Sequence, residues 1–148
     1  MNSTQLKILL ADDDKDDCGF FHDALQQLPI ETTLTTVSDG EQLMNYLAEN
    51  KEKLPAVLFL DLNMPRKNGF ECLSEIKQDE KLKDLPVVIF STSDSRDKIN
   101  SLFKSGAQVY IRKPGDFEQL KEVIHHALPI ATEKRGHAVN SLKYILNA

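Results

Sequence analysis

Short apolar runs alternate along this chain with segments of helical period. Five runs predict β-strands at Lys7–Ala11, Thr32–Val37, Ala56–Leu60, Pro86–Phe90 and Gln108–Arg112. The third and fourth runs are apolar on both faces, which is typical of central strands in a parallel sheet. Strands that alternate with helices predict a parallel sheet covered by helices.

Between the strands, apolar residues recur at the three- and four-residue spacing of amphipathic helices. Gly106 follows the fourth helical segment and predicts its C-terminal end. The chain therefore holds five β-α units, which predict an open, doubly wound α/β sheet with right-handed crossovers. The five apolar stripes contain Phe21, Ala24, Leu25 and Leu28; Leu43, Met44 and Leu47; Phe70, Leu73 and Ile76; Ile99, Leu102 and Phe103; and Phe117, Leu120, Ile124 and Leu128.

Composition limits the classes of protein to consider. The 148 residues are 41% hydrophobic and 28% charged, which is ordinary for one globular domain. A net charge of −5 with scattered basic residues disfavours a nucleic-acid binder. The two cysteines lack the spacing of a metal site or a disulfide framework. Without a long apolar segment or a signal-like N-terminus, the expectation is a cytoplasmic protein with no membrane partner.

Polar residues follow four of the five predicted strands. In an open parallel sheet, the ligand site lies beyond the carboxyl ends of the strands. The sequence therefore predicts one pocket that combines several carboxylates, a hydroxyl and a cation. The strand-end groups are Asp12-Asp13-Asp14, Asp61, Ser91-Thr92-Ser93 and Lys113-Pro114.

This set of residues limits the chemistry. Clustered carboxylates repel one another and favour a hard divalent ion such as Mg²⁺. Lys113 can pair with a carboxylate or a phosphoryl oxygen, and Ser91 can donate a hydrogen bond. The four histidines lie in helical segments away from the strand ends, which disfavours a Ser/His/Asp site. The combination instead predicts phosphoryl transfer to Asp61, with an acyl phosphate as the product.

Four motifs then resemble a known family. They are ILLADDD, LFLDLNMPRKNG, VVIFSTS and GAQVYIRKP, with 30 residues from Asp61 to Ser91 and 22 from Ser91 to Lys113. Together they make residues 6–128 similar to the receiver domains of two-component response regulators. The DD-rich first loop, QDEKLKDLP and STSDSRD look most similar to single-domain regulators that partner phytochrome-type histidine kinases.

The resemblance implies a fold and a function. The fold would be flavodoxin-like, or CheY-like, with strand order 2-1-3-4-5 and a receiver domain over residues 1–128. The domain would accept a phosphoryl group on Asp61 from a sensor histidine kinase or a histidine phosphotransfer protein, with Mg²⁺ (or Mn²⁺) as cofactor. It would switch protein–protein interactions with an unknown downstream protein in a phosphorelay. It would catalyse only its own phosphorylation and dephosphorylation, and would not be an enzyme in the usual sense.

The resemblance also implies roles for the acidic residues. Asp61 would be the phosphoacceptor. Asp13, Asp61 and the backbone carbonyl of Asn63 would ligate the metal ion, and Asp12 would hold a metal-bound water. The side chains of Asn63 and Ser93 would border the path of the hydrolytic water and tune the rate of dephosphorylation.

Further roles fall on the fourth and fifth strands. The hydroxyl of Ser91 and the ammonium of Lys113 would bind the phosphoryl group. Tyr110 matches an aromatic residue that swings inward when the hydroxyl moves, so both would switch the face formed by the fourth strand, the fourth helix and the fifth strand. Pro114 would carry a cis peptide bond, which only X-Pro bonds tolerate at small cost.

Each assignment has a plainer alternative. The acid run could cap and charge a helix start, and Asp14, Asp16 and Asp17 are interpreted as cap or solvated face. The triplet also leaves the register of the metal ligands open by one residue. Ser93 or Asp94 is expected to be the N-cap of the fourth helix. Taken alone, the fifth-strand lysine would be a surface residue and the tyrosine a half-buried strand aromatic.

Two other functions remain open. A phosphatase of the haloacid-dehalogenase type also uses a strand-end aspartate, but it needs a second acid two residues later, where this chain has Asn63. A degenerate receiver could serve as a binding scaffold, although such proteins lack pocket residues that are all present here.

The tail, residues 129–148, is too short for a separate output domain, so a single-domain regulator is expected. Its apolar residues approximate one helical face and predict a short amphipathic helix. Such a helix could pack on its own domain, or it could join a homodimer or bind a partner. The residues of this face are Ala138, Val139, Leu142, Ile145 and Leu146.

Overall fold

Strands and helices alternate along the chain in the order that the hydrophobic pattern predicts. The structure is a computed structural model that describes residues 5–93, 95–132 and 144–146. The strands are β1 Leu6–Ala11, β2 Thr32–Val37, β3 Val57–Leu60, β4 Val87–Ser91, β5 Val109–Arg112 and β6 Tyr144–Leu146. The helices are α1 Lys15–Gln26, α2 Gly40–Glu49, α3 Gly69–Gln78, α4 Arg96–Lys104 and α5 Phe117–Thr132.

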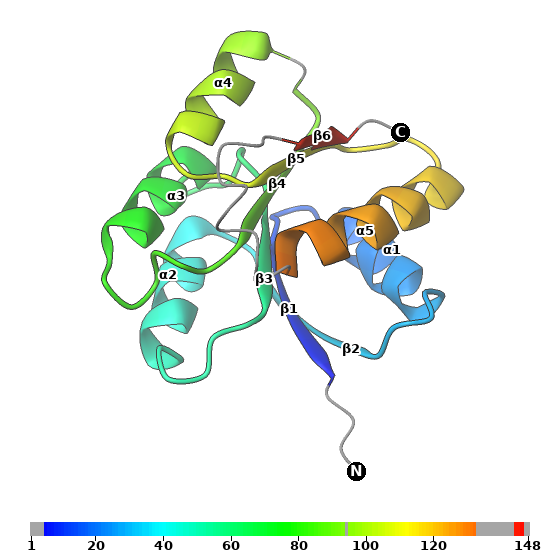
Figure 1. The fold of residues 1–148 in the computed structure, drawn as a ribbon, viewed down its shortest axis with the longest axis horizontal. Coiled ribbons are helices and arrows are strands. Elements are labelled where there is room, and N and C mark those ends of the chain that lie inside the picture. Colours follow the sequence, from blue (N-terminus) through cyan, green and yellow to red (C-terminus); the bar gives the residue numbers. More distant parts are fainter. Residues whose placement is uncertain (1–4, 94, 133–143, 147–148) are drawn as a thin grey trace.

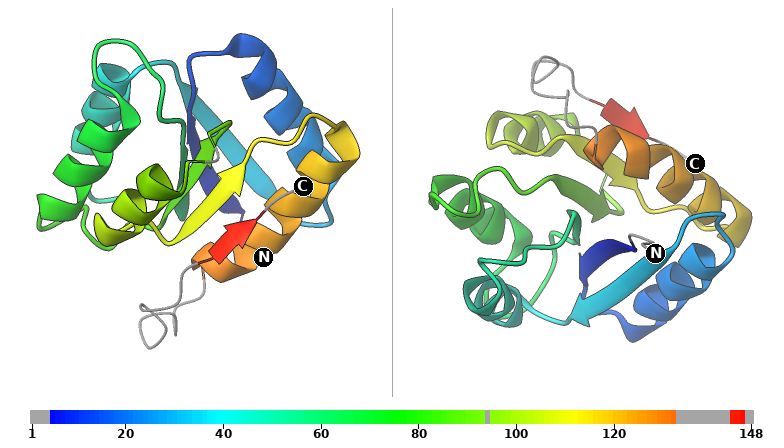
Figure 2. Two further views of the ribbon diagram at one scale, coloured as in Figure 1. Left: turned by 90° about the horizontal axis from the view of Figure 1, so that it is seen from above. Right: turned by 60° about the horizontal axis from the view of Figure 1, so that its bottom comes forward.

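The strands form one parallel sheet in the order β2-β1-β3-β4-β5-β6. Helices α1 and α5 cover one face of the sheet, and α2, α3 and α4 cover the other (Figure 1). Figure 2 shows the same three layers from two further directions. The predicted doubly wound α/β fold and its strand order 2-1-3-4-5 are confirmed, and β6 adds a strand beyond β5.

The hydrophobic core has two layers, one on each face of the sheet. All residues of β3 and β4 are buried, as predicted for central strands. Alternation along β3 sends Leu58 and Leu60 toward α2 and α3, and Val57 and Phe59 toward α1 and α5. Phe21 of α1 packs edge-on against Phe59, with 4.9 Å between ring centroids. This packing makes β3 a rigid support for the residue that follows it.

The helix N-termini are capped by side chains. Asp14 caps α1 by accepting hydrogen bonds from two backbone amides of the first turn, as expected. The expected N-cap of α4 at Ser93 or Asp94 is wrong, because Ser95 is the cap. Ser93 Oγ instead accepts the amide of Ser95, 3.2 Å away. Strand β4 runs to Ser91, one residue further than predicted, and Ser93 lies in the loop between this strand and the helix.

Helix α5 continues past the predicted domain boundary at Leu128. Pro129 lies inside the helix, and Ala131 is only 2% exposed. The Thr132 hydroxyl donates a hydrogen bond to the Leu128 carbonyl at 2.7 Å. The buried stripe thus persists beyond the proline and extends the helix, which places the predicted boundary inside α5.

The predicted C-terminal helix is wrong where the structure describes it. Ile145 and Leu146 lie in β6, which pairs in parallel with β5. The outer edge of β5 offers backbone groups for pairing, and this tertiary contact overrides the local helical pattern. The other residues of that predicted face, Ala138, Val139 and Leu142, lie outside the described residues.

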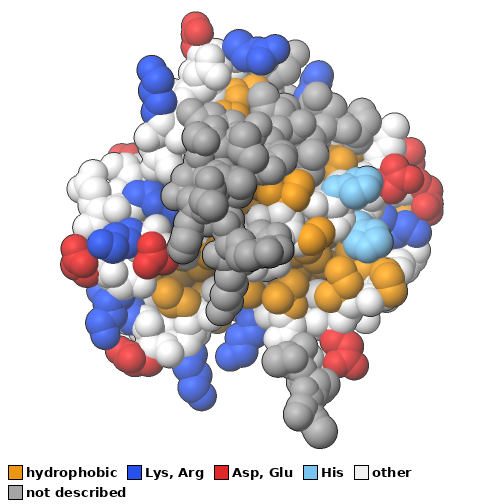
Figure 3. Space-filling view, viewed as in Figure 1, with side chains coloured by type: hydrophobic (Ala, Val, Ile, Leu, Met, Phe, Trp, Pro, Cys, Tyr) orange, Lys and Arg blue, Asp and Glu red, His pale blue; other side chains and the backbone are white. Residues whose placement is uncertain are grey.

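Surface charge agrees with the expectation from composition. Over the described part of the face drawn in Figure 3, basic and acidic side chains are interspersed. Among the described helices, none combines the length and the apolar character needed to cross a bilayer.

Glycines give a test of how tightly the loop after β3 is packed. A Cβ at Gly69 would lie 2.5 Å from the Asp61 carbonyl oxygen, whereas a Cβ at Gly19 in α1 would meet nothing within 4 Å. We expect Gly69→Ala to lower the free energy of unfolding by about 1–3 kcal/mol through overpacking. The control Gly19→Ala should raise it by about 0.5–1 kcal/mol, because alanine favours a helix. Urea unfolding measures both, and equal effects would contradict the prediction.

Candidate functional site

Backbone hydrogen bonds between neighbouring strands gather the candidate residues at the carboxyl edge of the sheet. The amide of Asp61, after β3, donates to the carbonyl of Ala11 at 2.9 Å. The amide of Lys113, after β5, donates to the carbonyl of Ser91 at 2.8 Å. The parallel register therefore brings the ends of β1, β3, β4 and β5 together, as the strand-end rule predicts.

Three carboxylates form the centre of the site. Asp12 and Asp61 are 1% and 5% exposed, while Asp13 is exposed to solvent. One oxygen from each of the three lies within 4.8 Å of the others. Asp14 caps α1, so the members of the acid triplet that lie beside Asp61 are Asp12 and Asp13.

The loop between β3 and α3 holds Asp61 in place. The amide of Gly69 donates to the carbonyl of Leu62 at 3.0 Å, which closes the loop onto the end of β3. Asn68 and Glu71 form a capping box that fixes the start of α3. The side chain of Asn63 lies in this loop and is exposed.

Lys113 contacts three carboxylates. Its Nζ lies 2.9 Å from Asp17 Oδ2, 3.0 Å from Asp12 Oδ2 and 3.8 Å from Asp61 Oδ1. The Lys113 side chain is 11% exposed, and its ammonium lies 5.3 Å from the centre of the Phe90 ring. The lysine is therefore a partly buried cation within an acidic cluster.

Burial shifts the protonation equilibria of the site. It raises the pKa of Asp61 to about 6, although the charge of Lys113 opposes the rise. It also raises the pKa of Asp12, against a backbone hydrogen bond from Asp14 and the contact with Lys113. Burial alone would lower the pKa of Lys113, but its hydrogen bond to Asp17 and the nearby charges of Asp12 and Asp61 outweigh that effect and raise it. The positive charge near Asp12 and Asp61 therefore does not fully offset the cost of burying their ionised carboxylates.

The arrangement fits a divalent metal ion. Asp12 Oδ2 is buried and lies 3.0 Å from the Lys113 ammonium, yet the pKa of Asp12 stays raised because its burial outweighs this contact. Carboxylate oxygens that lie this close together are the donor set that Mg²⁺ and Mn²⁺ prefer. Asp12, Asp13 and Asp61 are therefore suited to hold such an ion or its bound water.

A chain of hydrogen bonds connects β4 to β5. Ser91 is fully buried, and its Oγ accepts the amide of Ser93 at 3.2 Å. The hydroxyl of Tyr110 donates to the carbonyl of Ser93 at 2.5 Å. Tyr110 is 1% exposed and packs in the layer beneath α4, so it is not the half-buried aromatic of the plainer alternative. A movement of the Ser91 hydroxyl can thus reach Tyr110 through one loop residue.

Two site residues were not predicted from the sequence. The sequence predicts that Asp17 caps the helix or lies on its solvated face, but its carboxylate makes the shortest of the three ion pairs of Lys113. For Phe90 the sequence predicts only a place in the fourth strand. Asp17 lies in the first turn of a helix that starts at the site, and this position is the signal that could have identified it. Phe90 ends the apolar run before the strand-end hydroxyl, but nothing local marks it as a partner of the lysine.

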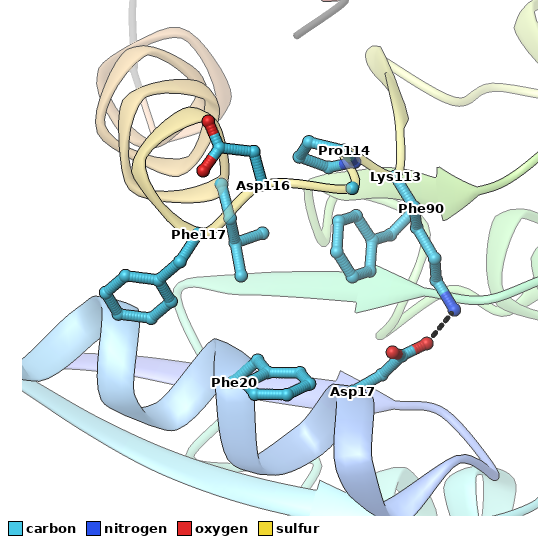
Figure 4. Close-up of a pocket in the computed structure, with 9 residues that line it drawn as sticks. Asp17, Phe20, Phe90, Lys113, Pro114, Asp116 and Phe117 are labelled. Atoms are coloured by element: carbon cyan, nitrogen blue, oxygen red, sulfur yellow. Dashed lines mark hydrogen bonds and ion pairs between the residues drawn. The ribbon is translucent and has the colours of Figure 1, made fainter.

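A cavity of about 400 Å³ lies beside the acidic cluster, between α1 and the loop after β5 (Figure 4). Phe20, Phe117 and Leu120 contribute apolar walls, while Asp17 and Lys113 line it next to the cluster. Phe20 is 55% exposed. The cavity adjoins the three metal-binding candidates but is not lined by them.

One geometric prediction is wrong. The described residues contain no cis peptide bond, so the bond before Pro114 is trans, the form that X-Pro bonds favour in most contexts.

Ser93 caps no helix but joins Ser91 to Tyr110 through hydrogen bonds. The hydrolytic roles of Asn63 and Ser93, and the metal-ligating carbonyl of Asn63, stay predictions.

Comparisons with known proteins agree with this geometry. The family model for the response regulator receiver domain matches residues 8–125. The Synechocystis response regulator Rcp1 is 32% identical over 121 residues, which cover 79% of this chain and 82% of that protein. The probable methanogenesis regulatory protein FilR2 of Methanothrix harundinacea is 32% identical over 120 residues, or 79% of this chain and 77% of that protein.

Solved structures give the same result. The phosphorylated cyanobacterial phytochrome response regulator RcpA matches with a TM-score of 0.80 at 33% identity, covering 88% of this chain and 96% of that one. The Mn²⁺-bound form of Rcp1 matches with a TM-score of 0.75 at 30% identity, covering 86% and 95%. Sequence motifs, strand order and strand-end residues therefore agree, and the chain belongs to the family of response regulator receiver domains.

Proposed function

We propose that this receiver domain accepts a phosphoryl group on Asp61 from the phosphohistidine of a sensor kinase or a phosphotransfer protein. The observation that carries the proposal is a buried carboxylate at the end of β3, with the Lys113 ammonium 3.8 Å from it and two further carboxylates beside it. These are the parts of a phosphoacceptor site. Relatives named as phytochrome response regulators favour a phytochrome-type kinase as the donor.

The chemistry follows from the positions of these groups. A carboxylate oxygen of Asp61 attacks the phosphorus, and the phosphorus–nitrogen bond to the donor imidazole breaks. The bonding electron pair stays on the nitrogen, and a new phosphorus–oxygen bond makes an aspartyl phosphate. Lys113 then lies close to the added negative charge, and the buried hydroxyl of Ser91 can donate to a phosphoryl oxygen.

We further propose that the site works with Mg²⁺ or Mn²⁺. Asp13, Asp61 and the backbone carbonyl of Asn63 would hold the ion, and Asp12 would hold one of its waters. A bound divalent ion supplies positive charge to the phosphoryl oxygens during transfer. One oxygen from each of Asp12, Asp13 and Asp61 lies within 4.8 Å of the others, and this close grouping of carboxylates supports the assignment.

The signal would leave the site through contacts between proteins. Ser91, Ser93 and Tyr110 form a connected path from the acidic cluster to the packing under α4. Phosphorylation would shift an equilibrium between two states of the face formed by β4, α4 and β5. A downstream protein or a second copy of the chain would bind that face.

Sustained phosphatase turnover is not expected. The position two residues after the nucleophile holds Asn63, whose amide cannot act as a general acid or base. The protein would then catalyse only its own phosphorylation and dephosphorylation. A single labelling event with acetyl phosphate, and no turnover of a generic phosphate ester, distinguishes the two functions.

The phosphoacceptor assignment is tested by intact mass. Incubation with acetyl phosphate and Mg²⁺ should add one phosphoryl group to the wild type and none to Asp61→Asn, because an amide is not a nucleophile for this reaction. Asp23→Asn, a change of equal size at an exposed aspartate of α1, is the control and should label like the wild type. An adduct on Asp61→Asn, or none on the wild type, would overturn the assignment.

The raised pKa of Asp61 predicts how stability depends on pH in the absence of metal. The folded-state pKa of about 6 lies above the ordinary value of 3.8, so stability falls as the pH rises through this window. Asp61→Asn should therefore raise the free energy of unfolding at pH 7.5 in EDTA by about 1–3 kcal/mol, with little change near pH 4. Urea unfolding measures this, again with Asp23→Asn as the control.

Added Mg²⁺ should make the wild type more stable than Asp61→Asn, the reverse of the order expected in EDTA. Binding to the folded state stabilises the wild type, while the variant has lost one ligand and should gain less. A wild type whose stability does not respond to Mg²⁺ would contradict the metal assignment.

The switch is tested with beryllofluoride, a stable mimic of the phosphoryl group. In the presence of Mg²⁺ it should shift the backbone amide resonances of Ile99–Tyr110, because Ser91 and Tyr110 connect the site to this segment. Asp61→Asn should show no such shift. Unchanged resonances over this segment in the wild type would refute the switch.

A further inference from the structure

Asp17 is the closest partner of Lys113. Its carboxylate accepts a hydrogen bond from the ammonium at 2.9 Å, whereas Asp61 lies 3.8 Å from the same atom. Figure 4 shows this contact bridging α1 and the end of β5. In this conformation the lysine is held toward the first helix and away from the proposed phosphoacceptor.

Several carboxylates compete for the single positive charge of Lys113. Three carboxylates lie within 4.0 Å of the ammonium, those of Asp12, Asp17 and Asp61, and a fourth, Asp13, lies beside Asp12 and Asp61. The Asp17 side chain is 34% exposed, so solvent screens its interaction in part. The other two partners of Lys113 are buried and belong to the proposed metal and phosphoacceptor set, which leaves Asp17 as an outside competitor for the cation.

A phosphoryl group on Asp61 would change this balance. It would bring additional anionic oxygens near Nζ, and an ammonium has three hydrogens to share among its acceptors. Asp17 would keep its hydrogen bond from the Lys113 ammonium and would also repel the new anion. The carboxylate in α1 thus opposes the state in which Lys113 binds the phosphoryl group.

We propose that Asp17 is a positioning residue that competes with a phosphoryl group on Asp61 for the ammonium of Lys113, and so weakens the hold of the site on its phosphoryl group. The inference rests on the proposed phosphoacceptor function and adds a residue that regulates it. Loss of the Asp17 charge strengthens binding of the anion and prolongs the life of the aspartyl phosphate.

The experiment measures beryllofluoride binding by fluorine NMR at saturating Mg²⁺. Asp17→Asn keeps the shape of the side chain and removes its charge. The half-saturating concentration should fall by about two- to fivefold, the range that a partly exposed ion pair contributes. The aspartyl phosphate made with acetyl phosphate should decay more slowly by a similar factor. In the free protein, the nitrogen resonance of the Lys113 ammonium should shift.

Asp16→Asn is the matched control, because it removes the same charge from an exposed residue in the same helical turn. It should leave beryllofluoride binding, decay and the ammonium resonance as in the wild type. Asp17→Glu, which keeps the charge, should restore behaviour close to the wild type.

Three results would overturn the inference alone: unchanged binding in Asp17→Asn, weaker binding in Asp17→Asn, or an equal gain in Asp16→Asn. A wild type that binds no beryllofluoride and forms no mass adduct would instead overturn the proposed function on which the inference rests. The two failures are therefore distinguishable in one set of measurements.

Discussion

The buried carboxylate of Asp61 is the constraint on which the rest of the site depends. A charge at the end of a strand buried on both faces is costly unless cations or donors surround it. Here the neighbours are Lys113 and two further acids, so the charge is only partly balanced and the pKa of Asp61 rises to about 6. A site that lacks positive charge is suited to bind a divalent ion and then an anionic group that the ion accompanies.

The fold holds this unbalanced cluster in place through its backbone. Strand-to-strand hydrogen bonds fix the ends of β1, β3, β4 and β5, and the close approach of Gly69 fixes the loop after Asp61. The two core layers make the strands rigid, so the carboxylates cannot separate to relieve their repulsion. Lys113 has a flexible stem and several alternative acceptors, which makes it the adaptable charge of the site.

The same edge of the sheet also connects the site to the core layer beneath α4. The hydroxyl oxygen of Ser91 accepts a hydrogen bond from the amide of Ser93, and the carbonyl of Ser93 accepts one from the hydroxyl of Tyr110. A change at the cluster therefore has a short covalent and hydrogen-bonded route to the packing under α4. On the other side, Asp17 and Phe90 contact the lysine, so residues of α1 and β4 surround the cation that would pair with a phosphoryl group in the proposed function.

The sequence by itself determined the five strands, the five helices, the sheet order expected from its motifs, and the convergence of Asp12, Asp61, Ser91 and Lys113. The strands, the helices and the convergence follow from local hydrophobic period and from the rule that parallel strands end at one edge, whereas the sheet order follows from the resemblance of the motifs to receiver domains. Only the tertiary structure decided the pairing of Asp17 with Lys113, which are 96 residues apart, the near-complete burial of Tyr110, and the strand conformation of Tyr144–Leu146, where the sequence predicts part of a helix. Each of these depends on how one element lies against another that is distant in the chain, and a local pattern carries no information about that contact.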